Sequence, residues 1–426
     1  MKPLSEVVAR FNALFDRPGD VRALAIIRIL VGPIVIYHLW PFVEQMTRGT
    51  YYADFFYSPW ATWLPTPPRS LYFVMLSAAL VSACLMSLGY KTRWSAGYTA
   101  FFVTLTFAGF LTYLVYPAIP PWLAVSDGHD IYVESVGRVG GIAAVYLHGG
   151  PGSGCQPDHR RLFDPERFHA VLFDQRGAGR SRPKGRREAN TLPHLIADME
   201  AIRKKFGFER WMIVGGSWGA TLALAYAQAH PDRVTGIVLR ATFLGTIQEI
   251  ENGFLNVLPR FYPGLYDDFL NVLPEAERTQ PVQAYFRRIL DPNPDVNIPA
   301  ARAWGETERI LSEHAPNRAR LDLIALNSSR SPPATPFMEA HYFANDCFMQ
   351  PNQLLREADR LSSIPGIIVQ SRYDLLCPPA TSHALGALWR EAEIRFVEGA
   401  GHTLYDPGVR DAVMKAIADM ASRISK

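Results

Sequence analysis

The sequence predicts an α/β fold, a mostly parallel sheet between helix layers with a helical cap, preceded by about three transmembrane helices. Two patterns indicate this organisation. Long uncharged apolar runs lie before residue 118, whereas after it short runs rich in Val, Ile and Leu alternate with amphipathic stretches. We therefore expect a membrane-embedded helical segment at 1–121, a core in two parts at 122–242 and 361–426, and a cap at 243–360.

The N-terminal segment contains two stretches without any charged residue, Ser70–Tyr90 and Ser95–Pro117. Each has about the 20 residues that a spanning helix needs. A third stretch, Ala23–Trp40, is shorter and contains Arg28 and Pro33, so it is a weaker candidate. The alternative is that all three are buried helices of a soluble core. Two uncharged runs of this length favour insertion among membrane lipids.

Positive charges flanking these stretches predict their orientation, because Lys and Arg accumulate on the cytoplasmic side. The N-terminus would then be cytoplasmic, and everything after Pro117, including the core and the cap, would be extracytoplasmic. The sequence "IIRILVGPIVIYHLW", followed by a loop rich in Tyr, Phe and Trp, weakly resembles the start of the HTTM family of membrane proteins. No activity follows from that resemblance.

Composition excludes several classes of protein. The net charge is +3 for 426 residues, and no Lys/Arg block is interleaved with aromatic residues, so nucleic-acid binding is not expected. The four cysteines are scattered, without a CxxC pair or a Cys/His cluster. A disulfide scaffold and a zinc site are therefore not expected either.

Short apolar runs, each closed by a glycine or a polar residue, mark the expected strands after residue 121. Such runs without alternation are typical of strands buried on both faces of a sheet. The stretch from about Phe243 to Arg360 breaks this rhythm and is rich in helix formers, which indicates a helical insertion over the sheet. The runs are "AAVYLHGG", "AVLFDQRG", "WMIVGGSWG", "GIVLRA", "GIIVQSRYD" and "IRFVEGAGH".

The segment Gly215–Gly219, "GGSWG", fits the pattern G-x-S-x-G between an apolar run and a helical stretch. In this pattern the strand-to-helix turn is so tight that its neighbours must be small, and the serine is exposed at the carboxyl edge of the sheet. We expect Ser217 to be a nucleophile. The alternative is a glycine-rich turn without chemistry.

A serine hydroxyl needs a base to take its proton and an acid to orient that base. In this fold class the acid and then the base follow the serine along the chain. Asp374 and His402 meet that order, because each follows a later apolar run. The competing histidines His148, His341 and His383 are expected to be structural, and Asp174, which precedes the serine, is expected to stabilise a loop.

The tetrahedral intermediate of acyl transfer needs backbone donors for its oxyanion. One donor is expected to be the N–H of Trp218, directly after the nucleophile. The other is expected from the glycine loop "HGGPG", most plausibly from Gly149 or Gly150. A phosphate-binding interpretation of this loop lacks the required lysine.

With these motifs the chain resembles the prolyl aminopeptidase (proline iminopeptidase) family of α/β-hydrolases from about residue 122 to 426. The motifs are "VSDGHDIYVE", "HGGPGSG", "FDPERFHAVLFDQRGAGRS", "GGSWGATLALAYAQAHPDRV", "GIIVQSRYDLLCPP" and "GAGHT". The resemblance implies the α/β-hydrolase fold, release of N-terminal proline from peptides, and no cofactor or metal. It implies the same triad, Ser217, Asp374 and His402.

The family also binds the free α-amino group of its substrate with glutamates of the cap. The resemblance places them at Glu308, in "AWGETE", and at Glu339, in "MEAHYF". An ammonium taken out of water is costly to bury unless anionic partners replace its hydration. The alternative for each is a solvated face of a cap helix. Two positions depart from the family pattern, Thr307 and Ala340, and so does the segment "FLGTIQEIENG".

The leading expectation is a membrane-anchored serine aminopeptidase for peptides or small amides with a free N-terminus. An esterase or amidase on the same scaffold is the alternative, and a non-catalytic membrane scaffold is a weaker one. Glu308 and Glu339 discriminate among these, because an ester hydrolase has no ammonium to bind. The sequence leaves the oligomeric state open.

Overall fold

The computed structural model of the chain describes residues 81, 122–327 and 334–425. The chain divides into two compact units, Met1–Pro120 and Pro121–Lys426. The membrane helices, their orientation and the HTTM resemblance fall almost wholly outside the described residues and stay predictions. Within the described part, no helix has the length and apolar character needed to cross a bilayer.

The described residues form one eight-stranded sheet with the order β1-β2-β4-β3-β5-β6-β7-β8. Strands β3 to β8 run parallel, whereas β1 pairs antiparallel with β2, and β2 antiparallel with β4. The strands are β1 (Trp122–Ala124), β2 (Asp130–Gly137), β3 (Ile142–Leu147), β4 (Phe168–Phe173), β5 (Trp211–Ser217), β6 (Val234–Thr242), β7 (Gly366–Ser371) and β8 (Ala392–Val397).

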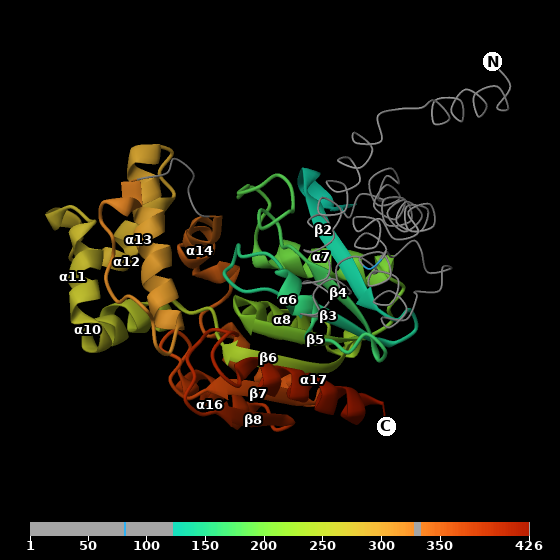
Figure 1. The fold of residues 1–426 in the computed structure, drawn as a ribbon. Coiled ribbons are helices and arrows are strands. Elements are labelled where there is room, and N and C mark those ends of the chain that lie inside the picture. Colours follow the sequence, from blue (N-terminus) through green and yellow to red (C-terminus); the bar gives the residue numbers. More distant parts are fainter. Residues whose placement is uncertain (1–80, 82–121, 328–333, 426) are drawn as a thin grey trace, which may run out of the picture. The chain divides into compact units, whose positions relative to one another are not determined.

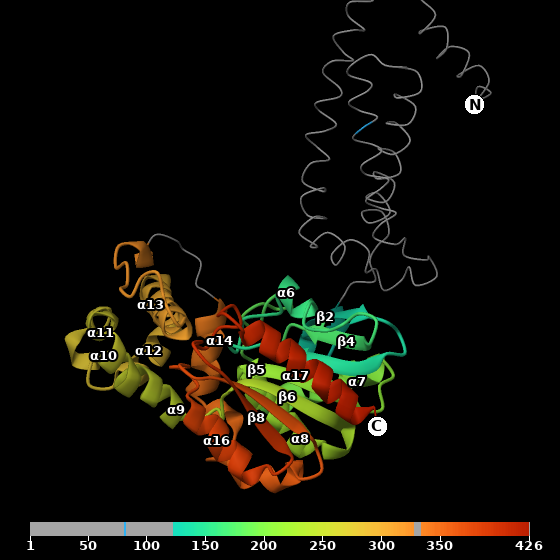
Figure 2. The same cartoon turned by 60° about the horizontal axis from the view of Figure 1, so that its bottom comes forward.

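Helices cover both faces of this sheet (Figures 1 and 2). One face packs against α7 (Leu192–Lys205), α8 (Trp218–Ala229) and α16 (Pro379–Leu388). The other face packs against α17 (Val409–Ile424) and the segment after α6 (Pro157–Arg160). Alternate residues of a strand point to opposite faces, so Val145 joins the first core and Tyr146 the second.

The prediction of a mostly parallel sheet between helix layers is confirmed, and each expected run forms part of one of the strands β3 to β8. Strands β1 and β2 were not predicted from the sequence. Strand β2 begins with alternating burial, which differs from the continuous apolar runs that predicted the other strands.

The cap consists of short helices between β6 and β7, at the left of Figure 1. Local signals set the helix starts, as where Thr246 accepts a hydrogen bond from the Glu249 N–H and begins α9. The principal elements are α9 (Ile247–Glu251), the π-helical turn η3 (Asn252–Val257), α10 (Leu258–Phe261), α11 (Pro263–Asn271), α12 (Pro281–Ile289), α13 (Pro294–Ser312), α14 (Ala334–Phe343) and α15 (Gln353–Arg356).

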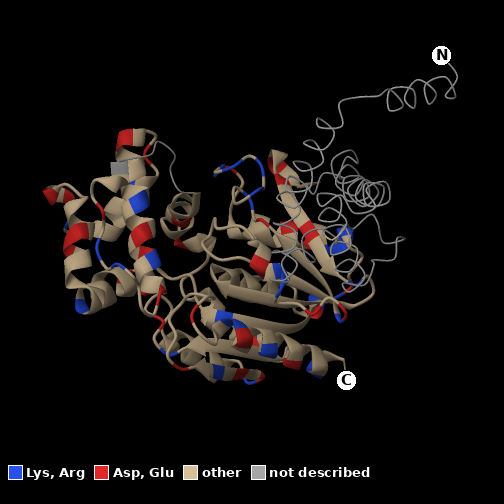
Figure 3. Ribbon diagram, in the orientation of Figure 1, with Lys and Arg blue, Asp and Glu red and all other residues tan. Residues whose placement is uncertain are grey.

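Acidic and basic residues alternate along α13 (Figure 3). Arg309 contacts Glu306 at 2.7 Å and Glu313 at 2.6 Å, one turn away on either side. Such i,i+3 and i,i+4 pairs support an exposed helix face by a few tenths of a kcal/mol, about 0.2–0.5 kcal/mol each. These charges therefore belong to the solvated side of the helix, while its buried side packs against the cap helices α11, α12 and α14.

Candidate active site

Ser217 occupies a strained turn between β5 and α8. Its backbone has φ 57° and ψ −125°, a conformation that non-glycine residues rarely adopt. The flanking glycines are required by space: a Cβ on Gly215 would lie 2.3 Å from the Gly219 carbonyl oxygen, and one on Gly219 would lie 2.1 Å from the Leu147 oxygen. The pattern G-x-S-x-G is thus a packing requirement, and it presents Ser217 at the carboxyl edge of the sheet.

A cleft of about 810 Å³ opens over this edge. Ser217 and His402 line it, together with Glu308 and Glu339 from the cap. The structure therefore brings together residues from β5, from the loop after β8 and from two cap helices, which lie far apart in the sequence.

His402 contacts Asp374 directly. Its Nδ1 lies 3.0 Å and 3.1 Å from the two Asp374 carboxylate oxygens. Asp374 is buried, and its Oδ1 accepts hydrogen bonds from the backbone N–H groups of Leu376 and Cys377. A carboxylate held in this way keeps the proton on His402 Nδ1 and leaves Nε2 free to act as an acceptor.

Asp374, Cys377 and His402 are also the group of potential metal ligands found among the described residues. Their side chains do not fit a metal well. The Asp374 carboxylate is already engaged by His402 and by two backbone donors, and burial raises the pKa of the Cys377 thiol well above its usual range, so that it stays protonated.

The glycine loop after β3 lies against the serine. A Cβ on Gly149 would lie 3.5 Å from the Ser217 Cβ, and both Gly149 and Gly150 line the cleft. Trp218 is the first residue of α8, and the first N–H groups of a helix have no partner within it. The expected oxyanion donors are therefore adjacent to the serine.

Gln175 joins these two donor segments, a role that the sequence analysis missed. Its Nε2 donates to the His148 carbonyl oxygen at 3.0 Å, and its Oε1 accepts from the Trp218 indole N–H at 2.8 Å. All three residues are buried. The motif "DQRG", directly after β4, was the only signal for this bridge between the glycine loop and the helix that follows Ser217.

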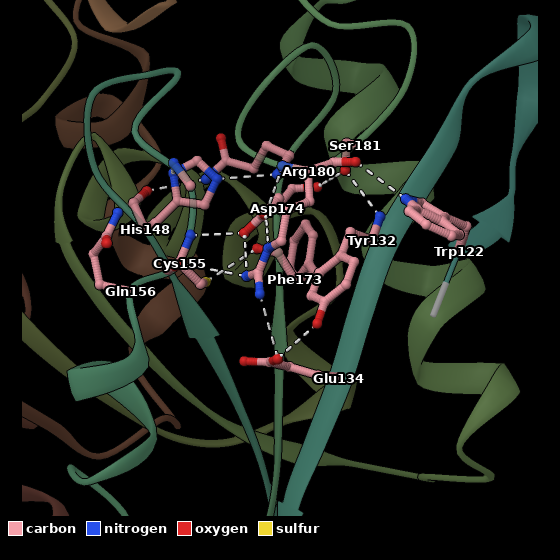
Figure 4. Close-up of polar contacts among 12 residues, drawn as sticks. Trp122, Tyr132, Glu134, His148, Cys155, Gln156, Phe173, Asp174, Arg180 and Ser181 are labelled. Atoms are coloured by element: carbon pink, nitrogen blue, oxygen red, sulfur yellow. Dashed lines mark hydrogen bonds and ion pairs between the residues drawn. The ribbon is translucent and has the colours of Figure 1, made fainter. Parts of the chain in front are cut away.

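Asp174 lies beneath the glycine loop and holds its far end (Figure 4). Its carboxylate accepts from the Cys155 N–H at 2.7 Å and from the Arg180 guanidinium at 2.7 Å. The neighbouring His148 accepts from the Gln175 N–H through Nε2, and burial lowers the pKa of this histidine. These contacts are of the structural kind expected for both residues.

The two other competing histidines lie in different surroundings. His341 is buried on α14, where its Nε2 lies 2.7 Å from the Asn190 carbonyl oxygen. His383 is exposed on α16. Neither lines the cleft that contains Ser217.

Glu308 on α13 and Glu339 on α14 face the cleft from the cap. Glu339 is fully buried, and its Oε2 accepts a hydrogen bond from the Trp304 indole N–H at 2.9 Å. Its Oε1 has no partner among the described residues apart from Glu308; their hydrogen bond acts to raise the pKa of Glu339 and to lower that of Glu308, so the shared proton lies on Glu339, and once Glu339 is ionised this oxygen has no donor. A buried carboxylate oxygen without a donor favours a site that receives one from a ligand.

Burial and mutual repulsion act on this pair of carboxyl groups. Burial raises the pKa of Glu308. Burial, followed by the charge of Glu308, raises the pKa of Glu339 well above its usual range. A cation between them would stabilise both ionised forms and reverse these shifts.

A smaller apolar subsite opens beside Ser217. It has a free volume of about 40 Å³, and Ser217, Gly150 and Glu308 lie at its polar side. Phe254 and Trp304 stack in its wall with their ring centroids 4.0 Å apart. The remaining residues of the wall are Phe243, Glu249, Ile250, Gly253, Phe343, Leu376 and Cys377.

Arg240, at the carboxyl end of β6, is another cleft residue that the sequence analysis missed. Its guanidinium donates to the His402 carbonyl oxygen and lies against Gly216, where a Cβ would come within 2.9 Å of it. Arg240 therefore fixes the backbone of His402 relative to the turn that carries Ser217.

Comparisons with known proteins agree with this architecture. A family model described as alpha/beta hydrolase fold matches residues 145–409. The chain is 40% identical to a proline iminopeptidase of Xylella fastidiosa over 310 residues, 71% of this chain and 97% of the relative. It is also 40% identical to a proline iminopeptidase of Arabidopsis thaliana, over 69% of this chain and 79% of that relative. A proline iminopeptidase of Neisseria gonorrhoeae is 38% identical over 71% and 96%.

Proposed function

The chain belongs to the proline iminopeptidase family of α/β-hydrolases and is a prolyl aminopeptidase-type hydrolase; from this premise we propose how its residues release N-terminal proline from peptides. Ser217, His402 and Asp374 form the catalytic triad in this proposal. Glu308 and Glu339 bind the substrate's charged amino group.

In the proposed reaction the Ser217 hydroxyl oxygen attacks the carbonyl carbon of the N-terminal residue, while His402 Nε2 takes the hydroxyl proton. Asp374 accepts the Nδ1–H of His402 and stabilises the imidazolium that forms. Backbone N–H groups of Trp218 and of Gly149 or Gly150 bind the oxyanion. His402 then protonates the departing peptide amine. In the second half of the reaction, water attacks the acyl carbon while His402 Nε2 takes a proton from it, and His402 then returns this proton to the Ser217 oxygen as the free amino acid leaves.

The observation that carries the selectivity is the buried Oε1 of Glu339, which has no donor among the described residues when Glu339 is ionised. An N-terminal ammonium supplies such donors together with a positive charge, whereas a neutral ester supplies neither. With the amino group at the two glutamates and the carbonyl at Ser217, the side chain of the N-terminal residue reaches the apolar subsite.

An assay of the purified full-length chain against proline and alanine arylamides, beside a simple acyl ester, tests this proposal. We expect turnover of the prolyl substrate with a higher kcat/KM than that of the alanyl substrate. Turnover of the ester alone would replace the proposal by the esterase alternative.

We further propose that residues 1–121 anchor the enzyme to membrane lipid and place residues 122–426 outside the cytoplasm. The support is the sequence, with its two uncharged runs joined to Trp122 by the proline-rich stretch "YPAIPP". We expect the full-length chain to need detergent and a chain that begins at Trp122 to dissolve without it. A full-length chain that is monomeric in plain buffer would contradict the anchor, and protease protection of the catalytic part in spheroplasts would contradict its orientation.

A further inference from the structure

Gly253 lies in the wall of the apolar subsite, in the π-helical turn η3. It is buried, yet a Cβ built on it would have no atom within 4 Å. Gly215 and Gly219, which are also buried, have no room for a Cβ at all. Outside its own helical turn, the space beside Gly253 is therefore open although the residue is buried, and since Gly253 lines the subsite we infer that a side chain here would enter it.

The rest of the wall leaves little freedom to change the size of this subsite. Phe254 stacks on Trp304, and the indole N–H of Trp304 is bonded to Glu339. Phe343 packs edge to face against Phe243 at 5.7 Å between ring centroids. These large side chains are buried and pack against one another, so the aromatic part of the wall has little room to move.

The turn that contains Gly253 is itself irregular. Residues Asn252–Val257 form a π-helical turn between α9 and α10, and such turns recur at functional sites. The turn carries Gly253 and Phe254 into the wall side by side.

We propose that Gly253 is a specificity-determining residue, which keeps the subsite open for the ring or short aliphatic side chain of the substrate's N-terminal residue. This inference rests on the proposed function and deepens it. With a free volume of about 40 Å³, the subsite favours proline and other short apolar residues, and each carbon added at position 253 takes part of that volume.

The test uses the full-length chain with Gly253→Ala and Gly253→Val and the arylamides of proline and glycine. Glycine has no side chain to place in the subsite and therefore reports on the triad and the amino-group site alone. We expect the ratio of kcat/KM for prolyl to glycyl substrate to fall about tenfold in Gly253→Ala and further in Gly253→Val, since one methylene in an apolar pocket is worth roughly 10–200-fold. Gly264→Ala, on cap helix α11 outside the subsite, is the matched control and should leave the ratio unchanged.

An unchanged or increased prolyl-to-glycyl ratio in a folded Gly253→Ala would overturn the inference. If neither variant folds, inhibition of the wild type decides the matter: pyrrolidine should inhibit about tenfold more strongly than methylamine, and equal inhibition would contradict an open subsite. Failure of the proposed function looks different, because the wild type would then hydrolyse the ester but neither arylamide.

Discussion

The sheet core and the helical cap have different roles in the proposed mechanism, since the core carries the reacting groups and the cap binds the substrate. In the proposed mechanism the core supplies Ser217, Asp374 and His402, which follow parallel strands of the sheet at their carboxyl ends. The proposed amino-group site and subsite residue, Glu308, Glu339 and Gly253, lie on cap helices whose positions depend on side-chain packing. The difference suggests that changes in the core alter the rate for every substrate, whereas changes in the cap alter which substrate is chosen.

The largest effect is expected from Ser217→Ala. Removing the nucleophile should lower kcat by about 10⁴–10⁶-fold for both a prolyl arylamide and a small ester, because both need the same attack. The measurement is kcat for both substrates in purified protein with an unchanged thermal midpoint.

His402→Ala should be nearly as severe for both substrates, and His383→Ala is its matched control. His383 is exposed on α16 and does not line the cleft, so its removal should leave kcat unchanged. A loss of activity in His383→Ala with full activity in His402→Ala would move the base to another residue.

The next prediction distinguishes the role of the cap from that of the core by comparing prolyl and ester substrates. Glu308→Gln and Glu339→Gln should each lower kcat/KM for the prolyl substrate. The expected loss of transition-state stabilisation is about 2–5 kcal/mol, the range for removing one partner of a buried charge pair. The ester should be hydrolysed almost normally, because the triad is untouched. A parallel fall for both substrates would mean that the glutamates support the fold instead.

A smaller effect is expected from Gln175→Met in the core. Loss of the bridge between His148 and Trp218 should loosen the oxyanion donors and lower kcat about 10–100-fold for prolyl and ester substrates alike, with little change in KM. Gln228→Met is the matched control, because Gln228 is equally buried but bonds to the Leu354 carbonyl oxygen instead. If both variants lose stability but neither loses kcat, Gln175 is a structural residue only.

The smallest effect concerns stability against pH. The pKa of Glu339 is raised in the folded chain, so the native state binds more protons than the unfolded state above the ordinary glutamate pKa of about 4.3. The free energy of unfolding should therefore fall as pH rises from the ordinary glutamate pKa up to the raised pKa. Urea midpoints at pH 5 and pH 8 should show this loss in the wild type and less of it in Glu339→Gln.

Glu306→Gln is the control for this pH effect, because Glu306 is a solvent-exposed glutamate on the same helix as Glu308. It should keep the wild-type dependence on pH. If the urea midpoint changes with pH equally in the wild type and in Glu339→Gln, the carboxyl pair Glu308 and Glu339 takes up no proton on folding.

The difference between core and cap also explains which parts of the fold and the site could be predicted from the sequence. Strands β3 to β8 and the turn at Ser217 follow from apolar runs and glycine spacing, which are local signals. Strands β1 and β2 were missed because β1 has only three residues and β2 begins with alternating burial, so neither contains such a run. Gln175 and Arg240 were missed because their partners, His148, Trp218 and His402, lie in other elements. The positions of Glu308 and Glu339 came from family resemblance alone.

In the proposed mechanism the cap glutamates bind the charged N-terminal amine and so determine which substrate reaches the catalytic triad. The most direct test compares proline arylamide with cyclopentanecarboxylic acid arylamide, which has the same ring but a carbon in place of the amine nitrogen. The full-length wild type should prefer the prolyl compound in kcat/KM by about 30-fold or more, the equivalent of at least 2 kcal/mol of charge pairing. Equal turnover of the two compounds would contradict the account.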